Sequence, residues 1–250
     1  MPNECCGLCE RGLLAQLSHE LRNPLAALSN GLYVLMKCQT GDARVARALV
    51  LMERQLRQMT SLVDNLTAVA TLGREGMVLH PTEVDLVRLV RDACHDFDYL
   101  FVAREIDLRM ELPEDTLLIW ADATRLTQVM GNLLQNAAQF TPPGGEVVVG
   151  LELNRAEKRA RLCLRDTGIG FDVELRQRLF HPNIRGVTAQ EHTRGGLGLG
   201  LVLVKGVVDL HGGAVWAESA GPGLGSTFVV ELPWPGLQRP EMPTTEANSV

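Results

Sequence analysis

The sequence predicts an α+β chain: an N-terminal helical hairpin that pairs into a dimeric four-helix bundle, followed by a domain of mixed helices and strands. Two patterns support this prediction. Apolar residues follow helical spacing up to about residue 70, and strand-like alternation mixes with amphipathic helices after residue 81. Apolar residues make up 46% of the 250 residues and aromatic residues only 4%, so Leu, Val and Ala must fill the core.

The predicted hairpin consists of two helices joined by a turn at residues 40–42. The first helix repeats leucine every seven residues, at Leu14, Leu21, Leu28 and Leu35. The second spaces its apolar residues by four and three, as a coiled-coil seam does, at Val45, Leu49, Met52, Leu56, Met59, Val63, Leu66 and Ala70. A single hairpin has too little core to be stable, so we expect a homodimer.

A different pattern follows a linker at residues 73–82. We expect helices at 86–98, 124–140 and 199–211, and strands at 106–112, 117–120, 146–153, 160–165, 214–219 and 226–232. These elements make a second domain at residues 83–233. A segment at 1–10 precedes the hairpin of residues 11–72, and a tail at 234–250, rich in Pro, Thr and Glu, is expected to be disordered.

Charge, apolar runs and cysteines limit the class of protein. A net charge of -6 without a long basic block argues against nucleic acid as the main partner. No apolar run predicts a membrane span, and the first residues do not look like a secretory signal. Cys38, Cys94 and Cys163 are interpreted as small core residues. The cluster CCGLC at 5–9 lacks a second ligand pair for zinc, and a reducing cytoplasm fits best.

His19 is the first candidate for chemistry. At about 100° per residue it points roughly 160° away from the leucines of its helix, and Asn23 shares its side. Pro24 is expected to bend the helix near Glu20. A neutral exposed imidazole is a competent nucleophile, and the neighbouring Glu20 can take or orient its proton. The plain alternative is a solvated polar face.

Two polar patterns in the second domain suit a nucleotide. Asn132 and Asn136, four residues apart, share one helix face, and amide oxygens are ligands that Mg²⁺ accepts. Asp166 ends an apolar strand and can accept a hydrogen bond from an exocyclic amine, while Gly168 and Gly170 allow a tight turn against a flat ligand. Taken singly, either pattern is also consistent with ordinary surface polarity or a loop.

Two glycine motifs lie further along the chain. The run at 195–200, with Gly196, Gly198 and Gly200, opens a helix and predicts an anion cradle of backbone amides. A dinucleotide-binding interpretation fails, because such a motif should follow the first strand of a βαβ unit. The preceding segment, 181–194, is interpreted as a lid in which Arg185 or Arg194 can reach phosphate. The second motif, at 225–228, is a turn into the last strand.

The order of these motifs resembles the sensor histidine kinases of two-component systems over residues 11–233. SHELRNPL is similar to the family's H box, GNLLQNAAQFTP to its N box, and DTGIGF to its G1 box. LFHPNIRG stands at the F box, GGLGLGL at the G2 box, and GSTFVVELP at the G3 box. The resemblance implies a phosphotransfer hairpin followed by the α/β-sandwich ATPase domain that gyrase, Hsp90 and MutL relatives share.

The same resemblance implies roles for individual residues. His19 would accept phosphate from ATP, with Glu20 as its acid-base neighbour, and Asn23 would position water for a phosphatase reaction on a response regulator. Asn136 would coordinate Mg²⁺ with Asn132 beside it, and Asp166 would bind the adenine amine. The expected nucleotide contacts also include Gly168, Gly170, Arg185, Gly196, Gly198, Gly200 and Thr227. Autophosphorylated His19 would pass its phosphoryl group to a receiver-domain aspartate.

Two departures and two rival functions accompany this prediction. Gln139 stands where the family usually has Lys or Arg, and Pro182-Asn183 stand where Pro-Phe is typical. A degenerate, non-enzymatic dimeric scaffold is one alternative, and a serine kinase or plain ATPase of the same nucleotide-binding class is another. Because only about ten residues precede the hairpin, we expect sensing to reside in a missing N-terminal domain or a separate protein.

Overall fold

The computed structural model describes residues 24–35, 45, 47–52, 55–56, 59, 63, 77–181 and 199–234. The chain divides into two compact units, one around the N-terminal hairpin and one that holds the described residues 78–180 and 204–234. The expected α+β class is confirmed. Among the described residues, no helix is both long and apolar enough to cross a membrane.

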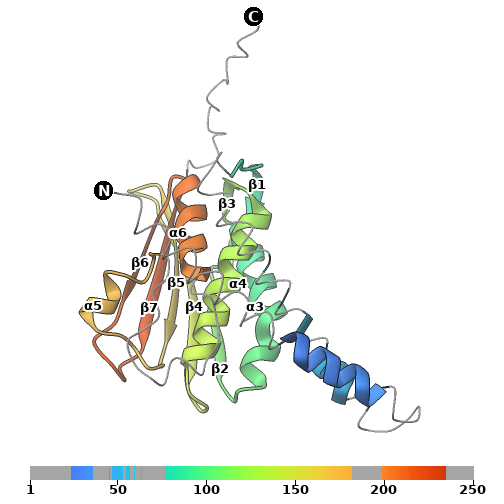
Figure 1. Ribbon diagram of the computed structural model, residues 1–250. Helices are drawn as coiled ribbons and strands as arrows, with labels where there is room; N and C mark the ends of the chain where they lie inside the picture. Colours follow the sequence, from blue (N-terminus) through green and yellow to red (C-terminus); the bar gives the residue numbers. More distant parts are fainter. Residues whose placement is uncertain are drawn as a thin grey trace, which may run out of the picture. The chain divides into compact units, whose positions relative to one another are not determined.

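The described part of the N-terminal unit is helical. Residues 24–35 form a helix, and the described residues between 45 and 63 are helical as well (Figure 1). A Cβ added to Gly31 would lie 2.4 Å from Met52 Cγ, so the two stretches approach closely there. Ala48 is buried in the same unit. Glycine at position 31 therefore permits close helix packing within one chain.

A row of apolar residues in this unit stays in solvent. Leu25 and Leu32 are 50% and 53% exposed, and Leu49, Leu56 and Val63 are 51%, 59% and 50% exposed. Within each set the residues are seven apart, which places them on one stripe of a helix. We call these five residues the exposed seam. Half-exposed apolar residues at coiled-coil spacing favour burial against further helices.

The second unit is built on a mixed five-stranded sheet in the order β2-β4-β5-β7-β6. These strands are β2 (Asp107–Glu111), β4 (Glu146–Asn154), β5 (Arg159–Asp166), β6 (Ala214–Glu218) and β7 (Ser226–Pro233). β2 runs parallel to β4, and the other pairs are antiparallel. β1 (Thr82–Asp85) and β3 (Leu118–Ala121) form a separate antiparallel pair.

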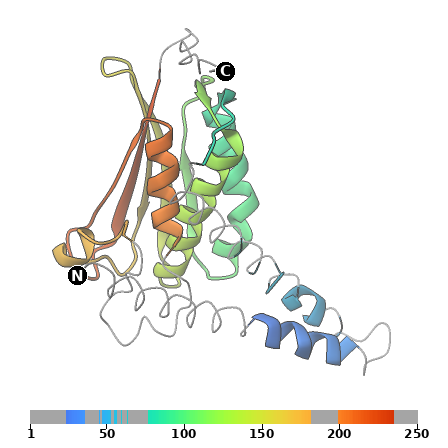
Figure 2. The same cartoon turned by 45° about the horizontal axis from the view of Figure 1, so that its top comes forward.

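Three helices cover one face of the five-stranded sheet. They are α3 (Leu86–Val102), α4 (Ala123–Phe140) and α6 (Gly200–Leu210), and both views place them in one layer (Figures 1 and 2). Alternate strand residues such as Val149, Leu164 and Val230 are buried beneath them, and Leu134 and Val207 are buried on the helices. The core therefore lies between this helical layer and the sheet.

Most elements lie within a few residues of the predicted ranges. The differences are β1, which begins at the last residue of the expected linker and was not predicted, the extension of α3 to Val102, and the short α5 (Val173–Arg176). The α3 helix starts where the Asp85 side chain accepts hydrogen bonds from the backbone N–H groups of Val87 and Arg88. The sequence of β1, TEVD, contains one apolar residue, Val84, so no apolar alternation marks it as a strand.

The other face of the sheet carries charged side chains. Arg161 donates to Glu231 and lies 5.9 Å from the ring centroid of Trp216. Arg109 forms ion pairs with Asp107 and Glu146 near the β2 edge. These long side chains cover the apolar residues between them, so this face needs no helical layer.

Candidate functional site

Asp166 is the last residue of β5 and one of the few buried charged residues in the described part of the chain. The residue is only 6% exposed. One carboxylate oxygen, Oδ1, accepts a hydrogen bond from the Gly168 backbone N–H at 2.8 Å, and Oδ2 accepts one from the Ser226 hydroxyl. The strand end thus holds a carboxylate in a fixed orientation within a largely dry environment.

The electrostatics of Asp166 follow from this burial. Burial raises the pKa of the carboxyl above its ordinary value, and the hydrogen bonds from Ser226 and Gly168 oppose that rise. A desolvated carboxylate with fixed donors is a strong acceptor for a further N–H group. The residue is therefore suited to recognise an amine on a bound ligand.

The loop after β5 is held by close backbone contacts. A Cβ on Gly168 would lie 2.5 Å from the Phe140 carbonyl oxygen, and the Ile169 N–H donates to that same oxygen at 3.1 Å. Gly170 has a φ of +59°, and a Cβ there would lie 2.3 Å from the Gly221 carbonyl oxygen. Both predicted glycines are thus required by the backbone, because a side chain has no space at either position.

Helix α4 brings the two asparagines to this loop. Asn132 is 7% exposed and Asn136 is half-buried one turn further on. Asn136 precedes Phe140 by one turn, and the Phe140 carbonyl is the group that contacts the loop. The Asn132 side chain donates to the Gln128 carbonyl at 2.9 Å. The structure therefore places the Asp166–Gly170 loop against the C-terminal end of α4, one turn beyond Asn136.

Both ends of α4 are fixed by specific hydrogen bonds. At its start, the Asp122 carboxylate accepts from the Arg125 backbone N–H at 3.1 Å. Near its end, the Arg104 guanidinium donates to the Ala138 carbonyl at 2.5 Å. Arg104 lies in the turn after α3, so this turn satisfies a carbonyl in the last turn of α4. The position of the asparagines is thus set from both ends.

Ser226, not Thr227, is the residue of the last strand that contacts Asp166. β7 pairs with β5 so that Ser226 lies opposite Asp166 and Thr227 opposite Arg165. Because successive strand residues point to opposite faces, the Thr227 side chain lies on the charged face of the sheet. The sequence prediction singled out Thr227 and missed Ser226. Knowledge of the β5–β7 register was needed to choose between the two hydroxyls.

Gly225 is a second residue of the 225–228 motif that the predicted nucleotide contacts did not include. It has a φ of +72°, and a Cβ there would lie 2.1 Å from the Asp166 carbonyl oxygen. Its N–H donates to the Gly168 carbonyl at 3.0 Å. The turn into β7 therefore packs directly on the Asp166 loop, which an isolated glycine in the sequence does not reveal.

Several predicted site residues lie outside the described part of the chain. These are His19, Glu20, Asn23, Arg185, Gly196 and Gly198. Of the six cysteines, Cys94 and Cys163 lie in the described part of the chain. Gly200 is described and begins α6, as the helix-opening motif predicted.

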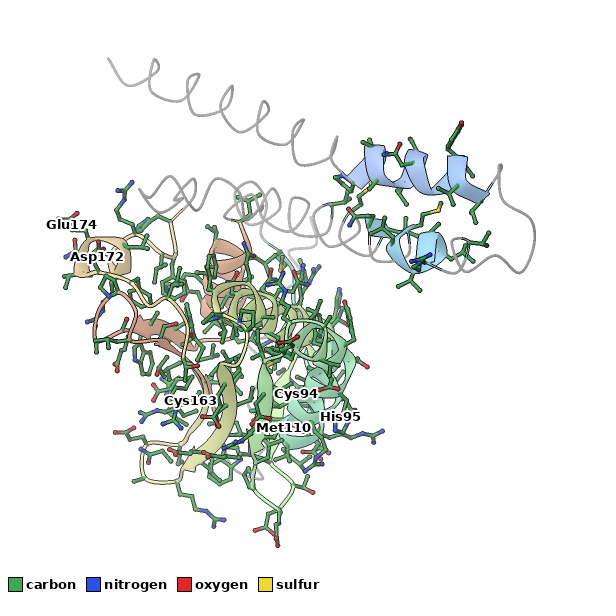
Figure 3. All side chains as sticks on the ribbon, turned by 90° about the horizontal axis from the view of Figure 1, so that it is seen from below. Cys94, His95, Met110, Cys163, Asp172 and Glu174 are labelled. Atoms are coloured by element: carbon green, nitrogen blue, oxygen red, sulfur yellow. The ribbon has the colours of Figure 1, made fainter. Side chains whose placement is uncertain are left out.

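The two described cysteines are free thiols in different environments (Figure 3). Cys94 lies on α3, and burial raises the pKa of its thiol to about 12. Cys163 lies on β5, opposite Gly150 on the charged face, and is half-buried. The expectation of a core residue thus holds for Cys94, whereas Cys163 lies outside the main core.

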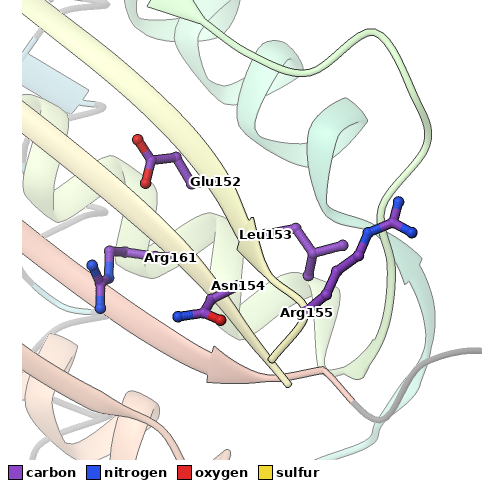
Figure 4. A pocket seen from close by; sticks show the side chains of 5 residues that line it. All are labelled: Glu152, Leu153, Asn154, Arg155 and Arg161. Atoms are coloured by element: carbon purple, nitrogen blue, oxygen red, sulfur yellow. The ribbon is translucent and has the colours of Figure 1, made fainter. Parts of the chain in front are cut away.

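A hollow in the second unit lies away from Asp166. It has a volume of about 450 Å³ and is lined by Glu152, Leu153, Asn154, Arg155 and Arg161 (Figure 4). This is the hairpin end of β4 and β5, whereas Asp166 ends β5 about 16 Å further along the strand from Arg161. Arg161 is already held by Glu231. The hollow is therefore separate from the candidate site.

Comparison with known proteins identifies both parts of the chain. Residues 10–75 match the family model of the His Kinase A (phospho-acceptor) domain. Residues 121–236 match that of the histidine kinase-, DNA gyrase B- and HSP90-like ATPase. The catalytic domain of the histidine kinase ThkA is similar in structure, with a TM-score of 0.54 and 30% identity over 62% of this chain and 95% of that one. The chain belongs to the sensor histidine kinase family.

Other histidine kinases match along nearly the whole chain. The adaptive-response sensory kinase SasA of Parasynechococcus marenigrum strain WH8102 is 31% identical over 225 residues, which is 90% of this chain and 57% of that protein. Full-length ShkA in complex with AMPPNP has a TM-score of 0.64 and 28% identity, over 88% of this chain and 45% of that one. The chain thus spans about half the length of these relatives.

Proposed function

We propose that this histidine kinase chain autophosphorylates His19 from ATP and passes the phosphoryl group to an aspartate of a response regulator. One observation carries most of the proposal. The buried Asp166 carboxylate and its glycine loop lie against the end of the helix that bears Asn132 and Asn136. An adenine-binding acid next to a phosphate-side amide pair is the arrangement that an ATP site requires.

Each predicted site residue named below has a role in this proposal. Asp166 accepts a hydrogen bond from the adenine amino group, and Ser226 and Gly168 hold the carboxylate in place. Gly168 and Gly170 keep the loop backbone close to the base, because a Cβ at either position has no space. Asn132 and Asn136 face the phosphates from α4. Gly196, Gly198, Gly200 and Arg185 are proposed to complete the phosphate cradle and lid.

Mg²⁺ is the proposed ion of this site, with Asn136 as its protein ligand. Among the described residues no group of three His, Cys, Asp or Glu side chains could hold a metal. An amide oxygen from a half-buried Asn136 fits a hard cation that takes its other ligands from phosphates and water. When bound, the ion neutralises charge on the phosphates during phosphoryl transfer.

The proposed reaction at His19 is an in-line displacement. An imidazole nitrogen of His19 attacks the γ-phosphorus, the bond from that phosphorus to the bridging oxygen breaks, and ADP leaves. Glu20 takes the proton that the ring loses. The product is a phosphoramidate on the imidazole. In a separate phosphatase reaction, Asn23 is proposed to position the water that hydrolyses the aspartyl phosphate of the response regulator.

The proposed assembly is a homodimer that docks a receiver domain. The exposed seam gives each hairpin an apolar stripe for a second copy, and two hairpins make a four-helix bundle. A solved complex of the kinase ThkA with the response regulator TrrA has a TM-score of 0.62 with 24% identity. We infer a cytoplasmic setting in which another domain or protein supplies sensing.

Labelling with radioactive ATP tests the proposed function. Wild-type protein with γ-labelled ATP and Mg²⁺ is expected to gain label that is stable in alkali and lost in acid, as a phosphoramidate is. His19→Gln should remove the label and retain ATP binding, whereas Asp166→Asn should remove both. Acid-stable label, or phosphate release that does not depend on His19, would indicate a serine kinase or plain ATPase.

The scaffold alternative rests on Gln139, which stands at a position where the family usually has Lys or Arg. A protein that binds ATP without any labelling would favour a scaffold with a weakened phosphate contact. Gln139→Lys provides the matching control, because it supplies the cation that this position lacks. Restored labelling in that variant would locate the defect at this residue.

A further inference from the structure

Both ring nitrogens of His211 are engaged at the C-terminal end of α6. Nδ1 lies 2.8 Å from the Val207 carbonyl oxygen, and the Asp122 backbone N–H donates to Nε2 at 3.0 Å. A backbone N–H can only donate, so Nε2 must be the acceptor and Nδ1 must carry the proton. This pair of hydrogen bonds therefore requires a neutral imidazole with one defined tautomer.

The partner of His211 joins two more segments. The Asp122 carboxylate accepts from the Arg125 backbone N–H, which caps α4, and from the His80 backbone N–H at 3.0 Å. Burial would raise the pKa of Asp122, but the hydrogen bonds from His80 and Arg125 outweigh it, and the pKa is lowered. Through one residue, His211 is connected to the start of α4 and to the segment that precedes β1.

The two helices joined in this way each carry part of the proposed nucleotide site. α4 and α6 lie side by side over the sheet in both views (Figures 1 and 2). α4 bears Asn132 and Asn136, and α6 begins at Gly200, directly after the glycine-rich segment. Because a helix is stiff over its length, fixing the last turn of α6 to the first turn of α4 limits how far α6 can shift.

We propose that His211 is a positioning residue for nucleotide binding, which holds α6 in register with α4 through the Asp122 N–H. This inference rests on the proposed ATP site and adds a residue that does not touch the ligand. A proton on Nε2 would face the Asp122 N–H, donor against donor, and the bond would be lost.

The charged groups around the ring do not replace this bond. On α4 these are Asp122, whose two oxygens already accept backbone N–H groups, and Arg125. On α6, Lys205 and Asp209 pair with each other. From β5, Arg159 donates to the carbonyl of Gly212 at 3.0 Å. A protonated ring thus has no equivalent route to the α4 backbone.

Two substitutions of His211 separate its two hydrogen bonds, the one with the Val207 carbonyl and the one with the Asp122 N–H. Gln at position 211 places an amide oxygen at about the reach of Nε2, so it can still accept from Asp122. Asn reaches only as far as Nδ1, so it can keep the Val207 contact but not the bridge. We expect His211→Asn to raise the Kd for ATP with Mg²⁺ about tenfold and His211→Gln to change it less than threefold.

Titration calorimetry on the intact chain provides the test. The Kd of His211→Gln should stay close to that of the wild type, because its amide can still accept from the Asp122 N–H, while that of His211→Asn should rise. Equal affinities in the wild type and His211→Asn, or equal losses in both variants, would overturn this inference alone. A wild type that binds no ATP would overturn the proposed function as well.

Discussion

The Asp166 carboxylate, which we propose binds adenine, carries a cost in stability. Burial raises its pKa despite hydrogen bonds from Ser226 and Gly168, so the folded chain holds this proton more tightly than the unfolded chain does. Its contribution to stability is therefore greatest below the unfolded pKa, about 3.9, and declines as the pH rises through the folded value. At neutral pH the ionised carboxylate opposes folding.

Asp166→Asn should separate the two roles. Removing the buried charge is expected to leave the Tm at pH 7 unchanged or higher, and this advantage should shrink as the pH falls towards 4. Affinity for ATP should drop at least tenfold, because the amide places a donor where the adenine amine needs an acceptor. Calorimetric melting and ATP titration measure both effects, and unaltered ATP affinity would refute the adenine role.

Ser226 and Thr227 form a matched pair of hydroxyl residues. Ser226→Ala removes the donor to Asp166 and should weaken ATP binding about tenfold, since hydrogen bonds to charged groups are worth about 1.5–3 kcal/mol. Thr227→Ala lies on the other sheet face and should change the Kd less than twofold. Titration of both variants with ATP decides the point, and the reverse order of effects would contradict the observed register.

At the residue scale, the sequence predicts a side chain well where its neighbours in the chain define its setting. Asp166, Gly168 and Gly170 follow one another after a strand, so their shared loop is predictable. Ser226 meets Asp166 only through strand pairing across 60 residues, and no local pattern encodes that register. The same reason explains why Gly225 was missed.

At the scale of elements, the loops around Asp166 depend on glycine for two separable reasons. Gly225 has a positive φ and also leaves no space for a Cβ, whereas Gly144 has a φ of +78° with nothing within 4 Å of an added Cβ. A left-handed backbone conformation, which strains any residue with a side chain, occurs at both glycines. The close approach to the Asp166 carbonyl belongs to Gly225 only.

Alanine at these two positions should therefore differ in effect. Gly144→Ala is expected to cost about 1 kcal/mol from the left-handed backbone alone. Gly225→Ala should cost several times more and should also weaken ATP binding, because the turn must move away from Asp166. Urea unfolding of both variants measures the difference. Equal losses would show that the close contact carries no energy.

Helices and longer strands were predicted to within a few residues because their periodic patterns are long. α4 was expected at 124–140 and occupies Ala123–Phe140, with its start fixed by Asp122. β1 has four residues of which Val84 alone is apolar, so no local pattern revealed it, whereas the equally short β3 is an apolar run and was predicted. Long periodic segments are in general predicted more reliably from sequence than short ones.

At the scale of the whole molecule, the exposed seam is the main indication of assembly. The half-exposed Leu32, Leu49 and Leu56 belong to a surface that a single chain leaves in water. The heptad spacing in the sequence predicts an apolar stripe of this kind on the hairpin.

Leu49→Glu tests the proposed dimer. A charge in the seam should shift the mass measured by light scattering from two chains towards one at micromolar concentration, because it cannot be buried without a partner. Val102→Glu is a suitable control, since Val102 is 68% exposed on α3 and lies outside the seam. A dimer that tolerates both substitutions equally would place the interface elsewhere.

The most direct test of the phosphotransfer mechanism is to locate the modified residue by mass spectrometry after exposure to ATP and Mg²⁺ at neutral or alkaline pH. The expected result is one phosphoryl group on His19, present in the wild type and absent when Asp166 is replaced by Asn. Phosphate on a serine or threonine, or on another histidine, would contradict the mechanism.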